Sequence, residues 1–266
     1  VSSSFFAAVC CAFSSADVVH IHAEGPAVMA WLPRLLGKRV IVTVHGLDWQ
    51  REKWKNGFGA KYIHAGEKMA VRHAHEIIVL SRNVQNYFME TYGRKTHFIP
   101  NGVDRPQNIP AQLITETYGL QDQDYILYLG RIVPEKGITY LVNAFKQVKT
   151  EKKLVIAGGA SDTDDYMRSL QELAADDPRI QFAGFVQGQL LEELYSNAYI
   201  YVLPSDLEGM PLSLLEAMSY GNCCLTSDIP ECTQVIGDMG VCFRKGDTDD
   251  LRDKLQQLCD DPQTVQ

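Results

Sequence analysis

The chain of 266 residues, with 45% hydrophobic and 22% charged side chains, has the composition of an ordinary globular protein of one or two domains. No apolar run approaches the ~18 residues of a membrane-spanning helix, so the sequence predicts no integral membrane segment. The net charge of -8 argues against a nucleic-acid-binding protein, whose binding face is usually basic. Seven cysteines without a CxxC pair indicate reduced thiols and a cytoplasmic protein.

Short β-branched runs alternate with amphipathic runs along the whole chain. This alternation is typical of parallel sheets joined by right-handed crossover helices. Near the start, the apolar stretch 5–13 predicts a buried helix rather than the core of a signal peptide. The predicted strands are 17–22, 39–45, 76–80, 97–99, 125–130, 153–157, 180–183, 199–203, 223–226 and 241–243, and the main predicted helices are 138–149, 166–175, 190–197 and 212–220.

A polar stretch punctuated by prolines, residues 100–110, separates two parts of opposite charge. Residues 1–110 contain 13 basic and 8 acidic side chains, whereas the rest of the chain contains 12 and 25. We therefore predict two doubly wound α/β domains, residues 1–110 and 111–266, that face a crevice. In such sheets ligands bind beyond the carboxyl ends of the strands, so residues directly after strands are the candidates for function.

The loop after the predicted strand 125–130 combines two cations with a tight turn. Arg131 and Lys136 flank this turn, and a helix N-terminus with free N–H groups follows. Cations beside such an end suit a diphosphate. The alternative is a solvated loop in which Lys136 pairs with Glu135. A glycine pair, Gly158-Gly159, follows the next strand and can bring backbone close to the same ligand.

Two glutamates eight residues apart flank the start of the predicted helix 212–220. Glu208 lies in the loop after strand 199–203, and Pro211 suits the first helical position, which places Glu216 in the second turn. Glu216 has apolar neighbours, and a carboxylate there needs partners such as the vicinal hydroxyls of a ribose. The alternatives are an exposed helix residue for Glu216 and a helix-capping carboxylate for Glu208.

These motifs together resemble the retaining GT-B glycosyltransferases of family 4. The resemblance rests on the run Gly130-Arg131-Ile132-Val133-Pro134-Glu135-Lys136-Gly137, on Ile99-Pro100-Asn101-Gly102-Val103-Asp104, and on the glutamate pair within EGMPLSLLEAM. It extends over nearly the whole chain. It implies two Rossmann-like domains and transfer of a hexosyl group from a nucleotide diphosphate sugar to an acceptor by front-face attack. The anomeric configuration would be retained, with neither a metal ion nor another cofactor.

The resemblance also assigns residues to the donor site. It implies that Arg131 and Lys136 hold the diphosphate and that Glu216 binds the ribose. Phe185-Val186 would lie near the base. The loop implied to touch the donor sugar and phosphates consists of Glu208, Gly209, Met210, Pro211 and Leu212.

His45 directly follows the predicted strand core 39–44, at the edge that faces the crevice. Family-4 enzymes carry a similar histidine near the donor sugar, so the resemblance implies a catalytic contact for His45. The residues alone favour a structural histidine. His20 and His22 lie on one face of a strand but lack a third ligand at suitable spacing, so we predict no metal site.

The segment 49–62 mixes cations with aromatic side chains, from Trp49 to Tyr62. Such a segment can contact an acceptor sugar or an anionic membrane surface, which would place a cytoplasmic protein on the membrane's cytoplasmic face. The alternative is an amphipathic helix with a solvated face.

The chain departs from the family pattern at both ends. The first strand with its glycine-rich loop and the last helices of the family are absent, so we expect a fragment whose N-terminal domain is incomplete. One alternative is therefore a non-catalytic nucleotide-sugar-binding module or an inactive fragment of an enzyme.

Two other classes of function fit less well. A metal-dependent transferase would use an Asp-x-Asp motif, but one such spacing precedes a strand and two precede helices as caps. These are Asp122/Asp124, Asp162/Asp164 and Asp247/Asp249. A dinucleotide-binding protein would carry GxGxxG after a strand, and the sequence has none.

Overall fold

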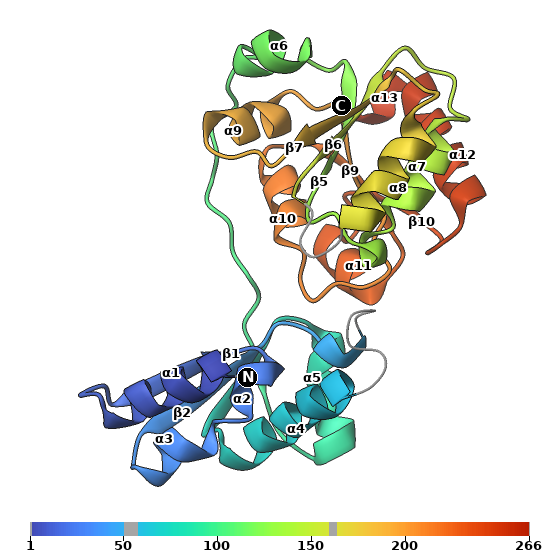
Figure 1. Cartoon of the computed structure of the whole chain (residues 1–266). Helices are drawn as coiled ribbons and strands as arrows, with labels where there is room; N and C mark the ends of the chain where they lie inside the picture. The colour runs from blue at the N-terminus through green and yellow to red at the C-terminus, as the bar shows by residue number, and fades with distance from the viewer. Residues whose placement is uncertain (1, 51–57, 160–163, 266) are drawn as a thin grey trace. The chain divides into compact units, whose positions relative to one another are not determined.

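A computed structural model describes residues 2–50, 58–159 and 164–265. The chain divides into two compact units, Val1–Asn101 with Glu208–Met210, and Gly102–Leu207 with Pro211–Gln266. Each unit contains one parallel sheet with helices packed on it (Figure 1). The predicted α/β class with two Rossmann-like domains is confirmed.

The sheet of the first unit has the strand order β1-β2-β3-β4, and each pair is parallel. Its core consists of valines and isoleucines of the central strands, packed on α4 and α5. The Ser81 hydroxyl accepts a hydrogen bond from Val84 N at 3.3 Å and begins α5, and Gly93 at φ 60° ends it. The strands are β1 (Val18–His22), β2 (Arg39–Val44), β3 (Glu76–Val79) and β4 (His97–Phe98). The helices are α1 (Ser2–Phe13), α2 (Glu24–Ala27), α3 (Trp31–Leu35), the 3-10 turn η1 (Asp48–Gln50), α4 (Phe58–His73) and α5 (Arg82–Tyr92).

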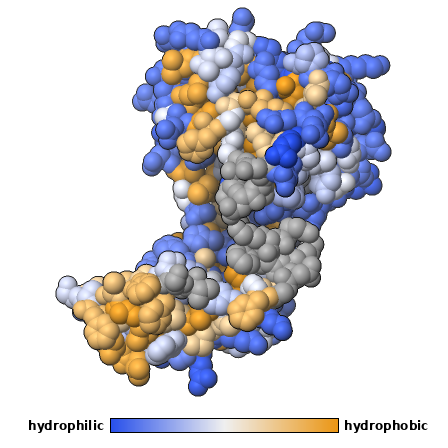
Figure 2. Space-filling view, viewed as in Figure 1, coloured by the Kyte–Doolittle hydropathy of each residue, from blue (hydrophilic) through white to orange (hydrophobic). Residues whose placement is uncertain are grey.

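The apolar stretch near the start forms the predicted helix α1, but its predicted burial is wrong. Phe5, Phe6 and Phe13 are 49%, 65% and 76% exposed. Together with Leu35 of α3 they give this unit an apolar face, which Figure 2 shows in orange. The apolar residues of α1 are distributed around the helix, so only one side of it can be buried. No helix among the described residues is both long and apolar enough to cross a membrane.

The sheet of the second unit has the order β10-β9-β8-β5-β6-β7. From the centre, the chain proceeds outward through β5, β6 and β7, then returns and proceeds the other way through β8, β9 and β10. In Figure 1, α7, α8 and α12 cover one side of this sheet, and α9 and α10 cover the other. The unit is therefore doubly wound, as predicted. The strands are β5 (Tyr125–Leu129), β6 (Lys153–Ala157), β7 (Ile180–Gly184), β8 (Ile200–Leu203), β9 (Cys223–Ser227) and β10 (Val241–Phe243). The helices are α6 (Leu113–Tyr118), the 3-10 turn η3 (Pro134–Lys136), α7 (Ile138–Phe145), α8 (Asp164–Ala174), α9 (Gln189–Ser196), α10 (Leu212–Ser219), α11 (Pro230–Ile236), α12 (Thr248–Asp260) and α13 (Pro262–Val265).

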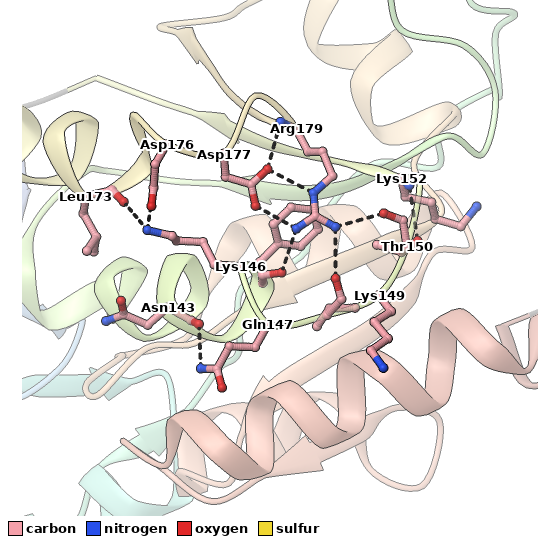
Figure 3. A network of polar contacts seen from close by, with 12 residues as sticks. Asn143, Lys146, Gln147, Lys149, Thr150, Lys152, Leu173, Asp176, Asp177 and Arg179 are labelled. Carbon is pink, nitrogen blue, oxygen red and sulfur yellow. Dashed lines mark hydrogen bonds and ion pairs between the residues drawn. The ribbon is translucent and has the colours of Figure 1, made fainter.

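Helix α7 ends at Phe145, four residues before the predicted end, and Arg179 binds carbonyls at and just beyond that end. The guanidinium donates to the carbonyl oxygens of Phe145, Val148 and Thr150 at 3.4, 3.0 and 2.9 Å, and it pairs with Asp177 at 2.7 Å (Figure 3). Val148 and Thr150 lie beyond the helix, so this cation supplies hydrogen bonds to the turn that follows α7. The hydrogen bond and charge of Arg179 lower the pKa of the Asp177 carboxyl.

Each predicted strand is present, with ends that differ by one residue at most from the prediction. The prediction of Asp247 as a helix cap is also confirmed, since its carboxylate accepts from Asp250 N at 2.9 Å at the start of α12. Asp164 begins α8, whereas Asp162 lies outside the described residues.

Candidate functional site

The second unit has one topological switch point, between the neighbouring strands β5 and β8. From these two strands the chain leaves in opposite directions, so the loops that follow them part and leave room for a ligand. Arg131 belongs to the loop after β5, and Glu216 to the helix that follows the loop after β8. The strand order therefore brings the two predicted donor-binding segments to one edge of the sheet.

Main-chain hydrogen bonds hold the loops after β5, β6 and β7 together. Gly130 N donates to Ala157 O at 3.1 Å, and Gly158 N donates to Gly184 O at 2.7 Å. Gly158 has φ 145°, and a Cβ there would lie 1.8 Å from Gly130 O. Glycine is required at this position, because any side chain would separate the two loops.

These loops line a hollow of about 300 Å³. It contains a cation, Arg131, and the phenyl ring of Phe185, which is 74% exposed. Val186 lies beneath them and is buried. An exposed flat ring beside a guanidinium suits a planar, electron-rich ligand group. The structure therefore places Phe185, Val186 and Arg131 around one hollow.

Lys136 has a different environment from Arg131. It ends the 3-10 turn η3, is only 9% exposed, and lines neither hollow described here. Gly137 follows it at φ 65°, where a Cβ would lie 2.0 Å from Pro204 O. Asp206 N also donates to Glu135 O at 2.8 Å. The loop containing Lys136 is thus fastened to the loop after β8.

Glu216 lies in the second turn of α10, as predicted, although Pro211 precedes the helix as its N-cap instead of occupying the first helical position. Pro211 has ψ 107°, an extended conformation, so the helix begins one residue later. The Glu216 carboxylate is half-buried, and its Oε2 accepts a hydrogen bond from the Tyr195 hydroxyl at 2.9 Å. Glu216 and Leu212 line a second hollow of about 820 Å³.

Tyr195 lies on α9 and is a site residue that no motif of the sequence singles out. The amphipathic pattern of 190–197 indicates that this helix has a buried face, but it does not say that a phenol of that face meets a carboxylate of α10. The other residues that line the hollow come from residues 102–106 and from the two helices. They include Arg105, Leu191, Glu192, Ser219 and Tyr220.

The remaining predicted residues belong to the first unit. Glu208, Gly209 and Met210 group with this unit, and so does His45, which directly follows β2 as predicted. His45 Nε2 lies 3.0 Å from His22 Nδ1, with the rings stacked at a centroid distance of 5.3 Å. A hydrogen bond between two ring nitrogens requires one donor and one acceptor, so it fixes the tautomers of the pair relative to each other.

His20 completes this row of imidazoles. Its ring lies 4.3 Å from that of His22, and its Nε2 is 2.7 Å from the Thr43 hydroxyl. Burial, and secondarily the charge of His22, lower the pKa of His20. In the described part of the chain, no group of three or more His, Cys, Asp or Glu side chains could hold a metal ion.

The first unit also contains a buried carboxyl pair that the sequence does not reveal. Glu24 and Glu67 are both 0% exposed. Glu24 accepts from Asp48 N at 2.9 Å, and Glu67 accepts from the hydroxyls of Tyr87 and Tyr92. Burial, a hydrogen bond to Glu67 and the charge of Glu67 raise the pKa of Glu24 to about 9. Glu24 is therefore protonated at neutral pH.

Comparisons with known proteins agree with this architecture. The chain is 27% identical over 248 residues to alpha-maltose-1-phosphate synthase of Mycobacterium tuberculosis, covering 85% of this chain and 63% of that protein. It is 25% identical over 268 residues to alpha-D-kanosaminyltransferase of Streptomyces kanamyceticus, covering 92% and 68%. Anabaena HepE, solved in complex with UDP and glucose, superimposes with a TM-score of 0.85 at 17% identity, over 100% of this chain and 74% of HepE.

Two family profiles match the chain. The profile described as Glycosyltransferase Family 4 matches residues 10–106, and the one described as Glycosyl transferases group 1 matches residues 123–261. The chain spans about three fifths of the length of the first curated relatives that it matches. Because the second match covers more than half of the chain, the protein belongs to the group 1 glycosyl transferases and has their two-domain GT-B fold.

Proposed function

We propose that the protein is a retaining glycosyltransferase that moves a hexosyl group from a nucleotide diphosphate sugar to an acceptor. The observation that carries the proposal is one edge of the second sheet. There the exposed ring of Phe185 and the guanidinium of Arg131 line one hollow, and Glu216, with one carboxylate oxygen bound by Tyr195, follows β8, the neighbour of β5. Family membership and the printed names of the relatives support a sugar-transfer reaction.

In this proposal the donor lies along the edge of the second sheet. Phe185 and Val186 contact the base, and Glu216 binds the ribose hydroxyls. Arg131 and Lys136 neutralise the diphosphate, whose negative charge grows as the bond to the sugar breaks. The loop Glu208–Met210, with Pro211 and Leu212, contacts the donor sugar and the phosphates.

Retention of the anomeric configuration determines from which face of the sugar the acceptor attacks. The acceptor oxygen forms its bond to the anomeric carbon on the face from which the nucleoside diphosphate leaves, and the proton of the acceptor hydroxyl passes to the departing phosphate oxygen. His45 donates a hydrogen bond to the sugar where charge develops. Cations of the protein supply the electrostatic stabilisation, so the proposal includes neither a metal ion nor another cofactor, and addition of EDTA should leave the rate unchanged.

Binding is tested first by titration calorimetry with UDP, GDP and ADP. Arg131→Ala, Lys136→Ala and Glu216→Ala should each weaken binding of the preferred nucleotide by about tenfold or more, since each removes a charged hydrogen-bond partner. Arg168→Ala and Glu172→Gln are matched controls, because they change an exposed charge on α8 of the same unit. Unchanged affinity in all three site variants would overturn the donor-site assignment.

Turnover separates the enzyme from a nucleotide-sugar-binding module. Release of nucleoside diphosphate from UDP-, GDP- or ADP-hexoses, abolished by His45→Ala, is the result expected of an enzyme. Binding without release would instead support the module.

We further propose that the acceptor, or an anionic membrane surface on the cytoplasmic face, contacts the segment from Trp49 to Tyr62. Residues 51–57 lie outside the described residues, Phe58 is 85% exposed, and Trp49 packs against the core of the first unit with its ring 4.9 Å from His64. The contact therefore relies on Phe58 and Lys61 among the described residues. Liposome sedimentation with anionic lipids tests the membrane contact, and an absence of salt-sensitive binding would exclude it.

A further inference from the structure

The hydroxyl of Tyr195 is the hydrogen-bond donor to the carboxylate of Glu216. The Oη–Oε2 distance is 2.9 Å, and Tyr195 is only 2% exposed. Burial, and secondarily the charge of Glu216, raise the pKa of Tyr195 far above its usual value. The phenol therefore stays protonated at neutral pH, and Glu216 Oε2 is the nearer of the two acceptors that its hydroxyl reaches.

Contacts on all sides fix the ring of Tyr195. It stacks on Tyr220 with a centroid distance of 5.3 Å and an angle of 17° between the rings, and it lies 6.1 Å from the ring of Tyr201. Its hydroxyl also lies 3.3 Å from Ser213 O, one turn before Glu216 on α10. Asn222 Nδ2 donates to its carbonyl oxygen at 2.9 Å. The donor is thus anchored at its main chain, its ring and its hydroxyl.

A glutamate side chain has three rotatable bonds, and a half-exposed glutamate without partners samples several rotamers. The hydrogen bond from Tyr195 restricts Glu216 to rotamers that keep Oε2 against α9. Among the described residues, no hydrogen bond involves Oε1, and both side chains line the hollow of about 820 Å³. The carboxylate is held in one orientation with acceptor capacity left for a ligand.

We propose that Tyr195 is a positioning residue of the donor site, which orients the Glu216 carboxylate for the vicinal hydroxyls of the donor ribose. The proposal rests on the proposed function, because it needs a nucleotide at Glu216. A purely structural phenol would influence every ligand equally or none, whereas a positioning phenol influences only ligands that carry the ribose hydroxyls.

The experiment measures Kd by calorimetry for the nucleoside diphosphate that the wild-type chain prefers and for its 2',3'-dideoxy analogue. Tyr195→Phe, which removes one oxygen and keeps the stacked ring, should weaken binding of the ribonucleotide about tenfold, a typical effect of a hydrogen bond to a charged group. Binding of the dideoxy analogue should change less than about twofold, and in a Glu216→Gln background Tyr195→Phe should have little further effect.

Tyr199→Phe is the matched control, since it removes another phenol of the unit whose hydroxyl donates to Leu258 O at 2.8 Å and which lines neither hollow. Glu216→Asp is a second test, because it keeps the charge and withdraws it from Tyr195. It should show the same ribose-dependent loss.

Equal losses for the two ligands, or unchanged affinity for the ribonucleotide in both variants, would overturn the positioning role while nucleotide binding stands. If the wild-type chain binds no nucleoside diphosphate, the proposed function fails and this role fails with it. Near-UV circular dichroism of each variant identifies an effect of misfolding.

Discussion

The carboxyl pair Glu24–Glu67 illustrates how one buried proton can control a unit's stability. The folded chain holds a proton on Glu24 up to a pH of about 9, whereas the unfolded chain releases it above its ordinary value of 4.5. Between these values the folded state binds more protons than the unfolded state. Raising the pH therefore favours unfolding, by at most about 1.4 kcal/mol per pH unit.

We predict that Glu24→Gln flattens this pH dependence. The amide keeps an acceptor for Asp48 N and has no proton to lose in this pH range. Urea unfolding between pH 6 and 9 should show the wild-type first unit losing about 1–3 kcal/mol that the variant keeps. Glu90→Gln, an exposed change on α5, should behave like wild type.

Other titratable groups lie near Glu24, and their own titration must not contribute to the pH dependence between pH 6 and 9. Glu67 of α4 and Asp48 face Glu24, and the phenols of Tyr87 and Tyr92 donate hydrogen bonds to Glu67. Burial and the hydrogen bond to Glu67 raise the pKa of Tyr87 to about 12. The phenols therefore stay neutral over pH 6 to 9. Equal slopes for wild type and Glu24→Gln would mean that Glu24 is not the group that loses the proton.

At the scale of loops and helices, Gly137 joins the loop after β5 to the loop after β8. We predict that Gly137→Ala destabilises the second unit by about 2–4 kcal/mol, because it adds a clash with Pro204 O at 2.0 Å to the strain of φ 65°. Gly119→Ala is the matched control at φ 63°, where nothing lies within 4 Å of the new Cβ.

The difference in unfolding free energy between the two glycine variants separates the cost of the clash with Pro204 O from the cost of backbone strain. Chemical unfolding monitored by circular dichroism should give a cost of about 1 kcal/mol for Gly119→Ala. If both variants lose the same free energy, the two loops are not in contact at Gly137.

Helix α7 depends on a cation from another element for its C-terminal end. We predict that Arg179→Leu lowers the free energy of unfolding by about 2–4 kcal/mol, because the carbonyls of Val148 and Thr150 lose their side-chain donor and the Asp177 carboxylate loses its ion pair. Arg168→Leu, a change at an exposed arginine on α8, should cost less than about 0.5 kcal/mol. Comparable urea midpoints for the two variants would contradict the capping role.

At the scale of the whole molecule, the predicted catalytic and binding residues are divided between two units. His45 belongs to the first unit, and Arg131 and Glu216 belong to the second. We predict that His45→Ala changes nucleotide affinity less than about twofold but lowers the rate of nucleoside diphosphate release by at least ~100-fold. Glu216→Ala should act mainly on affinity.

Calorimetry and a coupled release assay on the same preparations check this division. A His45→Ala variant that loses nucleotide binding and turnover together would show that donor binding is not a property of the second unit alone.

The local pattern of the sequence predicted most of the elements and where the functional loops begin. Periodicity and β-branching are local properties, so strands such as β6 and β10 were predicted to the residue, and Arg131, His45 and Glu208 were placed at the carboxyl ends of strands or in the loops that follow them. The end of α7 could not be predicted, because Arg179, which binds carbonyl oxygens at and beyond that end, comes from a distant part of the chain.

The sequence by itself determined the α/β class, the succession of strands and helices, and the side chains available at the strand ends, because these depend on neighbours along the chain. Only the tertiary structure decided that β5 lies beside β8, that Tyr195 donates to Glu216, and that burial next to Glu67 raises the pKa of Glu24. These relations arise from packing between segments far apart in sequence, where many partners are compatible with the same local pattern and burial selects one.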